Sequence, residues 1–263
     1  MGSRTYRAEG IVLKTNDFGE ADRILTVLTR HFGKVRVVAK GIRRPTSRLA
    51  GHAEPLVHAT FQLARGRELD VLTGAELRAP YRSVREDLDR IAAAWYVAEL
   101  ADRFTVDRAP SAPLFDLVES SLRHLEAGHP APLVCRWFDL HLLERSGFRP
   151  ELSCCARCQQ ALVEAAHAPF SWSAADGGVL CRGCAGAFAL GNAALTVRAL
   201  KSLRYLLLSD FAGAARLRVD ALLSTELDRH LRGFLRHVID RDIAAARLID
   251  DLARLPRPVA AVP

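Results

Sequence analysis

The chain contains 263 residues, of which 49% are hydrophobic and 25% are charged. This composition is typical of globular domains and excludes collagen-like, intrinsically disordered and small disulfide-rich proteins. Its net charge of +7 is unevenly distributed: residues 1–80 contain 14 basic and 8 acidic residues, a net +6, and the rest of the chain sums to +1. A basic excess confined to one segment is typical of a module that binds nucleic acid or another polyanion.

The first ten residues lack the apolar segment of a secretory signal. No uncharged apolar run reaches the ~18 residues that a membrane-spanning helix needs. We therefore expect a soluble cytoplasmic protein with no membrane partner. Cysteines in that compartment are thiols or metal ligands more often than disulfides, and this chain has six of them.

Five short segments with alternating apolar and polar residues precede residue 80. They span residues 7–15, 22–30, 34–42, 57–64 and 69–77. A period of two is typical of half-buried strands. Five strands in 80 residues favour a small closed barrel of the OB (oligonucleotide-binding) type. In the third segment Val35, Val37 and Ala39 alternate with the positions of Lys34, Arg36, Val38 and Lys40. We therefore expect one face of this strand in the core and the other to carry cations.

A run of six cations without an acidic residue covers positions 34–48. Its members are Lys34, Arg36, Lys40, Arg43, Arg44 and Arg48. We interpret the run as a DNA-binding track that contacts phosphates rather than base edges, because phosphates supply most of the affinity of basic surfaces. The alternative is a solvated charged surface with no partner.

Aromatic residues are few in the barrel segment. Phe18 and Phe32 lie near predicted turns and are available to stack bases, whereas Tyr6 and Phe61 are expected to fill the core. A small number of stacking side chains favours sequence-tolerant binding to the backbone of single or double strands.

From residue 83 the period of the apolar residues changes to about 3.6, which predicts helices. Ser83 and Glu86 have the spacing of a capping box ahead of apolar positions at Leu88, Ile91 and Ala98. Further helices are expected at 112–126, 132–146, 195–209 and 224–252, around an irregular stretch at 150–192. We therefore predict an OB-fold DNA-binding domain over residues 1–80 and an all-α helical domain over 81–263.

Two C-x2-C pairs in the irregular stretch predict a metal site at about residues 150–190. The ligands are Cys155, Cys158, Cys181 and Cys184. This pattern is typical of a zinc-finger-like structural Zn²⁺ site, one per chain, and four thiolates leave no position for a catalytic water. Gly177-Gly178 between apolar runs predicts a hairpin that leads to the second pair. The alternative is a set of thiols that holds no metal.

Sequence motifs for catalysis and nucleotide binding are absent. The chain has no G-x-x-x-x-G-K-[ST], G-x-G-x-x-G, H-E-x-x-H or G-x-S-x-G, and no clustered carboxylates in apolar surroundings. We expect neither an enzyme nor a nucleotide-binding protein. Basic stripes at Arg198, Lys201 and Arg204, and at 229, 232 and 236, are either partner-binding or solvated helix faces.

Several motifs together resemble the bacterial RecO family of recombination mediators. They are Gly19–Thr29 (GEADRILTVLT), Gly33-Lys34, Ala39-Lys40-Gly41, and Gly147–Leu152 (GFRPEL) ahead of the first C-x2-C. The resemblance covers essentially the whole chain and implies an OB-fold domain, a helical domain and a role in DNA repair by homologous recombination in the RecF pathway. Cys154 is not part of the family pattern, so the sequence leaves open whether Cys154 or Cys155 is the ligand.

The resemblance also implies partners and a location. A protein of this kind binds single- and double-stranded DNA, anneals complementary strands, and contacts the acidic C-terminal tail of single-strand-binding protein (SSB). With RecR it helps to load RecA onto SSB-coated DNA, and it works in the cytoplasm at the nucleoid. Two other hypotheses stay open at this point: an RNA-binding OB-fold protein, and a nuclease with a structural zinc.

Overall fold

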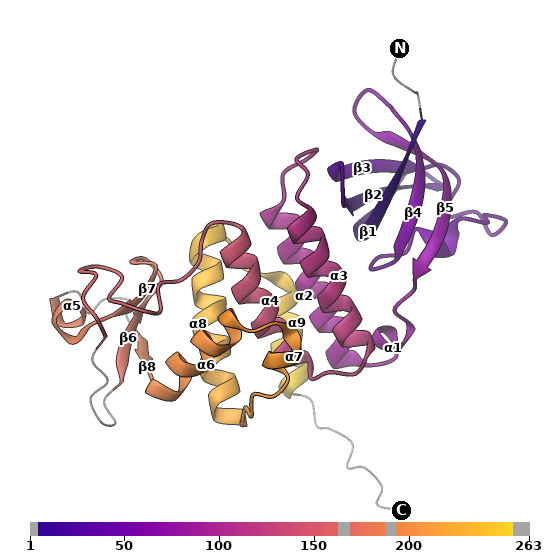
Figure 1. Ribbon diagram of the computed structural model, residues 1–263. Helices are drawn as coiled ribbons and strands as arrows, with labels where there is room; N and C mark the ends of the chain where they lie inside the picture. The colour runs from indigo at the N-terminus through magenta and orange to yellow at the C-terminus, as the bar shows by residue number, and fades with distance from the viewer. Residues whose placement is uncertain (1–4, 163–168, 188–192, 255–263) are drawn as a thin grey trace, which may run out of the picture. The chain divides into compact units, whose positions relative to one another are not determined.

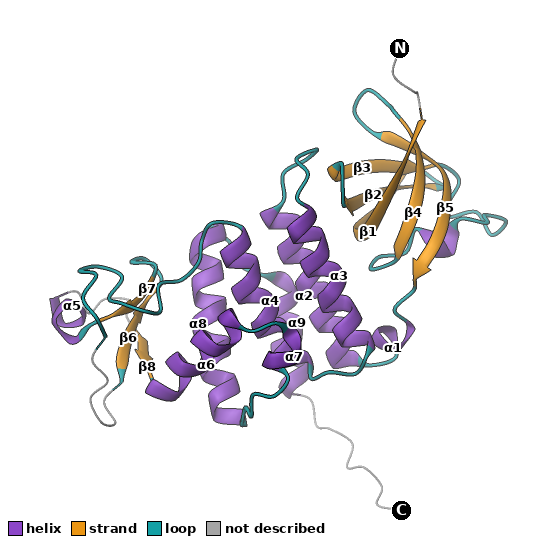
Figure 2. Cartoon of the chain, viewed as in Figure 1, coloured by secondary structure: helices purple, strands orange, loops and turns teal. Residues whose placement is uncertain are grey.

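The computed structural model describes residues 5–162, 169–187 and 193–254. The chain forms two compact units, of which the first contains residues 1–131 together with 243–263 and the second contains residues 132–242. Figures 1 and 2 show the helices and strands of each unit. In the described part of the chain, no helix has the length and apolarity to cross a membrane. The domain boundary at residue 80 stays a prediction.

The five predicted strands are confirmed, and they form a closed barrel in the order β1-β2-β3-β5-β4. Their bounds are β1 Thr5–Phe18, β2 Asp22–Thr29, β3 Gly33–Ala39, β4 His58–Ala64 and β5 Asp70–Ala79. Neighbouring strands are antiparallel except for β3 and β5, which are parallel. A 3-10 helix at Ala50–His52 lies in the β3–β4 connection.

The barrel core contains the residues that the alternation places there. Val35, Val37 and Ala39 are 1% exposed each and pack with Phe61, which is fully buried. Apolar burial of this kind is the main stabilising contribution to a small barrel. The intervening positions face outward: Arg36 is exposed there, whereas Val38 is apolar and only 8% exposed.

Four α-helices complete the described part of the first unit. Their bounds are α1 Arg82–Arg85, α2 Leu88–Phe104, α3 Ala112–Glu126 and α9 Ala244–Arg254. α2 buries alanines at 92, 93 and 94, which allow α3 and α9 to approach it closely. Glu99 of α2 accepts hydrogen bonds from the backbone N–H groups of Ala244 and Ala245, which satisfies two free donors at the start of α9.

The predicted capping box at Ser83 and Glu86 is wrong. α2 begins after Asp87, whose side chain accepts a hydrogen bond from the Arg90 N–H at 2.9 Å. Leu88 is 66% exposed and does not belong to the buried face. Asp is among the strongest N-cap residues, and Asp87 stands four positions after Ser83, directly before the helix.

The second unit contains α4 Ala131–Arg145, α5 Arg182–Ala187, α6 Val197–Leu208, α7 Phe211–Ala214 and α8 Ala221–Ile239. A three-stranded sheet in the order β7-β6-β8 joins β6 Phe170–Ser173, β7 Gly178–Leu180 and β8 Ala193–Leu195. α4 is buried on all sides, because every residue from 134 to 140 is buried.

The single helix predicted over 224–252 is wrong, because the structure has two helices there. α8 ends where Asp240 adopts a left-handed backbone conformation with φ 50°. Asp tolerates this conformation better than most residues. The polar residues at 240–242 interrupt the apolar period, so α9 starts a separate segment that belongs to the first unit.

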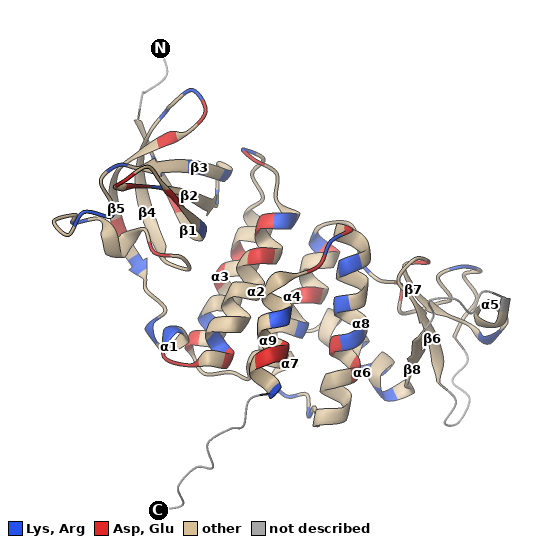
Figure 3. Cartoon of the chain, turned by 180° about the vertical axis from the view of Figure 1, so that it is seen from behind, with Lys and Arg blue, Asp and Glu red and all other residues tan. Residues whose placement is uncertain are grey.

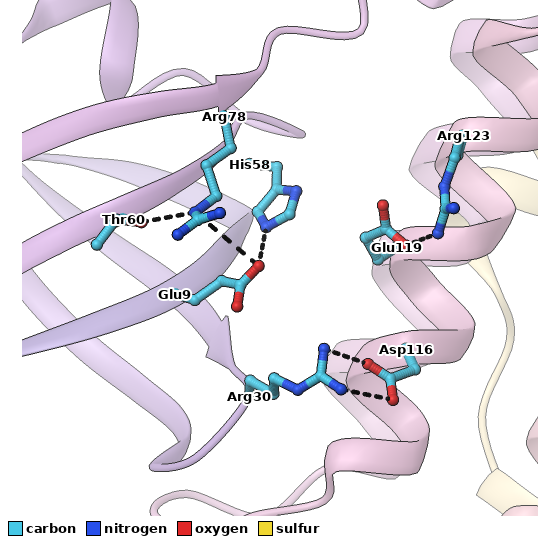
Figure 4. A network of polar contacts seen from close by, with 8 residues as sticks. All are labelled: Glu9, Arg30, His58, Thr60, Arg78, Asp116, Glu119 and Arg123. Carbon is cyan, nitrogen blue, oxygen red and sulfur yellow. Dashed lines mark hydrogen bonds and ion pairs between the residues drawn. The ribbon is translucent and has the colours of Figure 1, made fainter.

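Polar contacts join the barrel to α3 within the first unit (Figure 4). Arg30 forms an ion pair with Asp116 at 2.9 Å, and the ring of His58 lies edge-on to that of Phe115 with centroids 5.8 Å apart. His58 also contacts the Glu9 carboxylate at 3.0 Å. Burial lowers the pKa of His58, and the nearby Glu9 offsets part of that effect.

Candidate nucleic-acid interface and cysteine cluster

The outward side of strands β1–β3 divides into two cross-strand rows. One row consists of Ile11, Leu28 and Lys34, which are partners across the three strands; we call it the covered row. The next outward row consists of Lys14, Thr26 and Arg36; we call it the open row. Directly opposed residues on neighbouring strands project to the same face of a sheet. The two rows are thus neighbours on one surface.

The covered row is closed by the last turn of α2 and by the segment that joins α2 to α3. The Lys34 ammonium donates to the carbonyl oxygen of Asp102 at 2.7 Å and to its carboxylate at 2.9 Å. The Asp107 carboxylate lies 3.7 Å away, and the Lys34 side chain is only 13% exposed. Lys34 is therefore mostly buried between two carboxylates that match its charge.

The backbone of the same joining segment packs directly on β3. The Arg108 N–H donates to the Lys34 carbonyl at 2.8 Å. A Cβ atom built on Gly33 would lie 2.5 Å from the backbone nitrogen of Ala109, and Gly33 has φ +70°. Only glycine combines this conformation with so close an approach. Gly33 therefore allows the segment to contact the barrel.

A buried carboxylate anchors the segment to β5. Asp70 is fully buried and accepts hydrogen bonds from the Tyr6 hydroxyl at 2.5 Å, from the Gly66 N–H at 3.1 Å and from the Arg108 guanidinium at 3.1 Å. Burial alone would raise the pKa of Asp70, but these donors outweigh burial and lower it. Burial and the hydrogen bond to Asp70 raise the pKa of Tyr6 to about 12.

The two cations of the open row have no such cover, although Thr26 between them is 9% exposed. Arg36 and Lys40 are exposed, and among the residues that the structure describes neither has an ion-pair partner. Lys14 is exposed beside them in the same row as Arg36. Sequence reasoning missed Lys14, because its place in the row depends on an irregularity in β1 between Val12 and Lys14 that shifts the register. Figure 3 shows the basic positions of the barrel in blue.

The loop after β3 extends this basic surface. Arg43, Arg44 and Arg48 are exposed, as the predicted DNA-binding track requires. The Arg43 N–H donates to the Ala21 carbonyl at 3.0 Å, and its guanidinium lies 3.4 Å from the Asp17 carboxylate. The loop is thus held against the β1–β2 turn. We call the open row, Lys40 and the three loop arginines the basic surface.

Two more exposed arginines of the barrel were missed by the sequence reasoning. Arg65 and Arg67 lie in the β4–β5 loop, and the Arg65 guanidinium lies over the ring of Tyr6 at 5.1 Å. The basic character of this loop was missed because the acidic residues Glu68 and Asp70 lie close by in the sequence.

The basic stripes of the helical region are largely occupied by contacts inside the second unit. Arg198 pairs with Asp220, Arg204 donates to the Leu152 carbonyl at 2.7 Å, and Arg232 pairs with Asp228 at 2.9 Å. These contacts account for the charge of three of the six stripe residues without a partner.

The four predicted cysteines come together in the second unit. The sulfurs of Cys155, Cys158, Cys181 and Cys184 all lie within 4.8 Å of one another, and those of Cys158 and Cys181 are 3.7 Å apart. Tetrahedral Zn²⁺ with Zn–S bonds of about 2.3 Å needs sulfurs about 3.8 Å apart. All four residues are free thiols. The cluster therefore has the ligand set and the approximate dimensions of a zinc site.

The predicted hairpin brings the two pairs together. β6 pairs with β7 around Gly177, and Cys181 follows β7 directly. The segment before the first pair lies along β7: the Val179 N–H donates to the Glu151 carbonyl at 3.0 Å, and the Ala156 N–H to the Val179 carbonyl at 2.8 Å. A Cβ on Gly178 would lie 2.2 Å from the Glu151 oxygen, so glycine is required there.

The structure also distinguishes Cys155 from Cys154. Cys155 is in the cluster, and Cys154 instead donates from its thiol to the Gln159 side-chain oxygen at 3.1 Å. Burial would raise the pKa of Cys155, but backbone N–H groups of Cys158, Cys181 and Arg157 outweigh burial and lower it to about 6. N–H groups that stabilise a thiolate are typical of metal-binding knuckles.

Comparisons with known proteins cover nearly the whole chain. The model "Recombination protein O N terminal" matches residues 1–81, and "Recombination protein O C terminal" matches residues 85–246. A "DNA repair protein RecO" of Roseiflexus sp. (strain RS-1) is 39% identical over 257 residues, which are 98% of this chain and 89% of the relative. Another, of Desulforamulus reducens, is 36% identical over 256 residues, or 95% of each chain. One of Nocardioides sp. is 44% identical over 182 residues, which are 68% of this chain and 74% of the relative.

Proposed function

The chain belongs to the RecO family of DNA repair proteins, and from this premise we propose that it acts as a recombination mediator that binds single- and double-stranded DNA through the basic surface of its barrel. Members of this family are recombination mediators and are not known as enzymes. The nuclease hypothesis therefore has no support.

The basic surface is the observation that carries the proposal. Arg36 and Lys40 are exposed on the outward side of the barrel beside Lys14, and the loop arginines continue the same charge. A phosphate backbone carries one negative charge per nucleotide, and exposed cations bind it by releasing its counterions. Of the six cations in the predicted track, we assign Lys34 a structural role. The other five are the proposed DNA contacts.

Annealing follows from the same electrostatics. Two complementary strands repel each other, and a surface that neutralises part of both backbones lowers that repulsion without any chemical step. Family membership supports the further partners of the proposal: RecR, RecA loading, and the acidic C-terminal tail of SSB. A protein with these partners works at the nucleoid.

We also propose that the cysteine cluster holds one structural Zn²⁺ per chain. The ion would supply folding free energy by linking the two C-x2-C pairs, and no reaction step depends on it. Metal analysis of the purified protein tests the site: about one zinc per chain is expected, and Cys155→Ser should lose it while Cys154→Ser keeps it. A stoichiometry far below one, or loss of zinc from Cys154→Ser alone, would contradict the assignment.

An annealing assay tests the proposed function. Complementary oligonucleotides coated with SSB are mixed with wild-type protein or with the Arg36→Ala, Lys40→Ala double variant. We expect wild type to accelerate annealing and the double variant to lose most of that acceleration. Equal activity of the two proteins would reject the basic surface. Matched affinity for RNA and DNA of the same sequence would instead favour the RNA-binding hypothesis.

A further inference from the structure

One large aromatic side chain stands on the same side of the barrel as the basic surface. Phe18 ends β1 and is 51% exposed. Its partner across the strands is Asp22, at the last pair of the β1–β2 ladder. Side chains two and four positions apart on a strand project to the same face. Phe18 therefore shares its face with Lys14, about two rows away along the strand.

The other barrel aromatics are engaged in packing. The ring of Phe32 packs against Tyr6 with centroids 4.7 Å apart, and both lie against the barrel core. Phe61 is fully buried inside that core. Of the four described aromatics of the barrel, Phe18 is therefore the one whose ring is open to a ligand.

The turn beside Phe18 is held in place by the basic loop. Gly41 donates its backbone N–H to the Asp22 carboxylate at 2.7 Å, and the Arg43 N–H donates to the Ala21 carbonyl at 3.0 Å. On the other side, the Asp17 carboxylate contacts the Arg43 guanidinium at 3.4 Å. A ring on such a braced turn loses little conformational entropy when a ligand packs against it.

We propose that Phe18 stacks on an unpaired base of single-stranded DNA whose phosphates lie along the basic surface. This inference rests on the proposed function and adds a preference that charge alone does not supply. Cations contact the phosphates of single and double strands alike. An aromatic ring gains a stacking contact only with a base that is not already stacked in a duplex.

Stacking by Phe18 would also influence strand annealing. Two unpaired strands keep the stacking contact while they are bound, and the duplex they form has no free base to offer. The product therefore binds more weakly than the substrates, which favours its release.

The test compares Phe18→Ala with Leu77→Ala, a matched control at another exposed apolar position of the barrel, on β5. Affinities are measured for a single-stranded oligonucleotide and for a hairpin duplex of equal length at fixed salt. We expect Phe18→Ala to bind the single strand about tenfold more weakly, at the lower end of what one stacked base contributes. Its affinity for the duplex should stay within about twofold of wild type, Leu77→Ala should match wild type on both, and Phe18→Trp should retain single-strand binding.

A second readout reports stacking directly. A single strand with 2-aminopurine at successive positions should show a position whose fluorescence changes on binding wild type and not on binding Phe18→Ala. An equal loss of single-strand and duplex affinity, or no loss at all, would overturn the inference. If wild type shows no salt-dependent DNA binding, the proposed function itself fails. If wild type binds and Phe18→Ala binds equally well, only the stacking role fails.

Discussion

Lys34 and Arg36 stand two residues apart on one strand, face the same side, and have different surroundings. Lys34 lies under the α2–α3 segment with Asp102 as its partner, whereas Arg36 is exposed in the open row. The sequence makes them equivalent members of one basic run. Cations on one strand thus differ in role according to what packs on them: the covered row joins the barrel to the helices, and the open row is the part that we propose binds DNA.

The largest difference in stability between the covered side of the barrel and its uncovered side is expected from glycine substitutions. Gly33 and Gly19 both have positive φ, but a Cβ on Gly33 meets the Ala109 backbone, and one on Gly19 has nothing within 4 Å. We expect Gly33→Ala to lower the free energy of unfolding by about 3 kcal/mol or more, from conformational strain and overpacking together. Gly19→Ala should cost about 1 kcal/mol, from conformation alone. Urea denaturation measures both free energies of unfolding. Equal losses of stability in the two variants would contradict the close packing on Gly33.

A smaller difference in stability is expected between the two cations themselves. Lys34→Met removes charged hydrogen bonds from a mostly buried ammonium and leaves Asp102 without that partner. This should lower the free energy of unfolding by about 2 kcal/mol. Arg36→Met at an exposed position should change it by less than about 0.5 kcal/mol. A stability loss from Arg36→Met as large as that from Lys34→Met would remove the distinction between the rows.

The smallest effect concerns the pH dependence of the packing of α3 on the barrel. Burial lowers the pKa of His58 below its ordinary 6.5. The neutral ring is therefore favoured in the folded state, and its full contribution is present above about pH 6.5. As the pH falls below 6.5, His58 is protonated in the unfolded chain before it is protonated in the folded protein, because its pKa is lower in the folded state. The free energy of unfolding therefore declines.

His58→Gln removes this titration. Its free energy of unfolding should fall less between pH 7 and pH 5 than that of wild type. His31→Gln, at an exposed position, serves as the control and should follow wild type. Burial, with the charges of His129 and Arg123, also lowers the pKa of His124 to about 4, so part of the pH dependence remains in every variant. An unchanged pH profile in His58→Gln would show that His58 does not couple protonation to folding.

Local patterns predicted much of this structure. The alternation of Val35, Val37 and Ala39 identified the inward face of β3, and the spacing of the cysteines with Gly177-Gly178 identified both the cluster and its hairpin. These features depend on neighbours within a few residues or within one hairpin, where the sequence period and turn chemistry decide the conformation.

Long-range contacts explain the parts that were missed. The partner of Lys34 is Asp102, 68 residues away along the chain, so no local pattern separates Lys34 from Arg36. Lys14 joined the open row through a shift in strand register. The break at Asp240 was hidden because apolar residues with helical spacing occur on both sides of it.

The most direct test of the central claim is the salt dependence of DNA binding by three proteins. For wild type, the logarithm of the association constant should fall linearly with the logarithm of salt concentration. The Arg36→Ala, Lys40→Ala double variant should flatten that slope by about one to two units, and Lys34→Met should keep the slope of wild type. An unchanged slope in the double variant, or an equal flattening by Lys34→Met, would contradict the assignment of DNA binding to the open row.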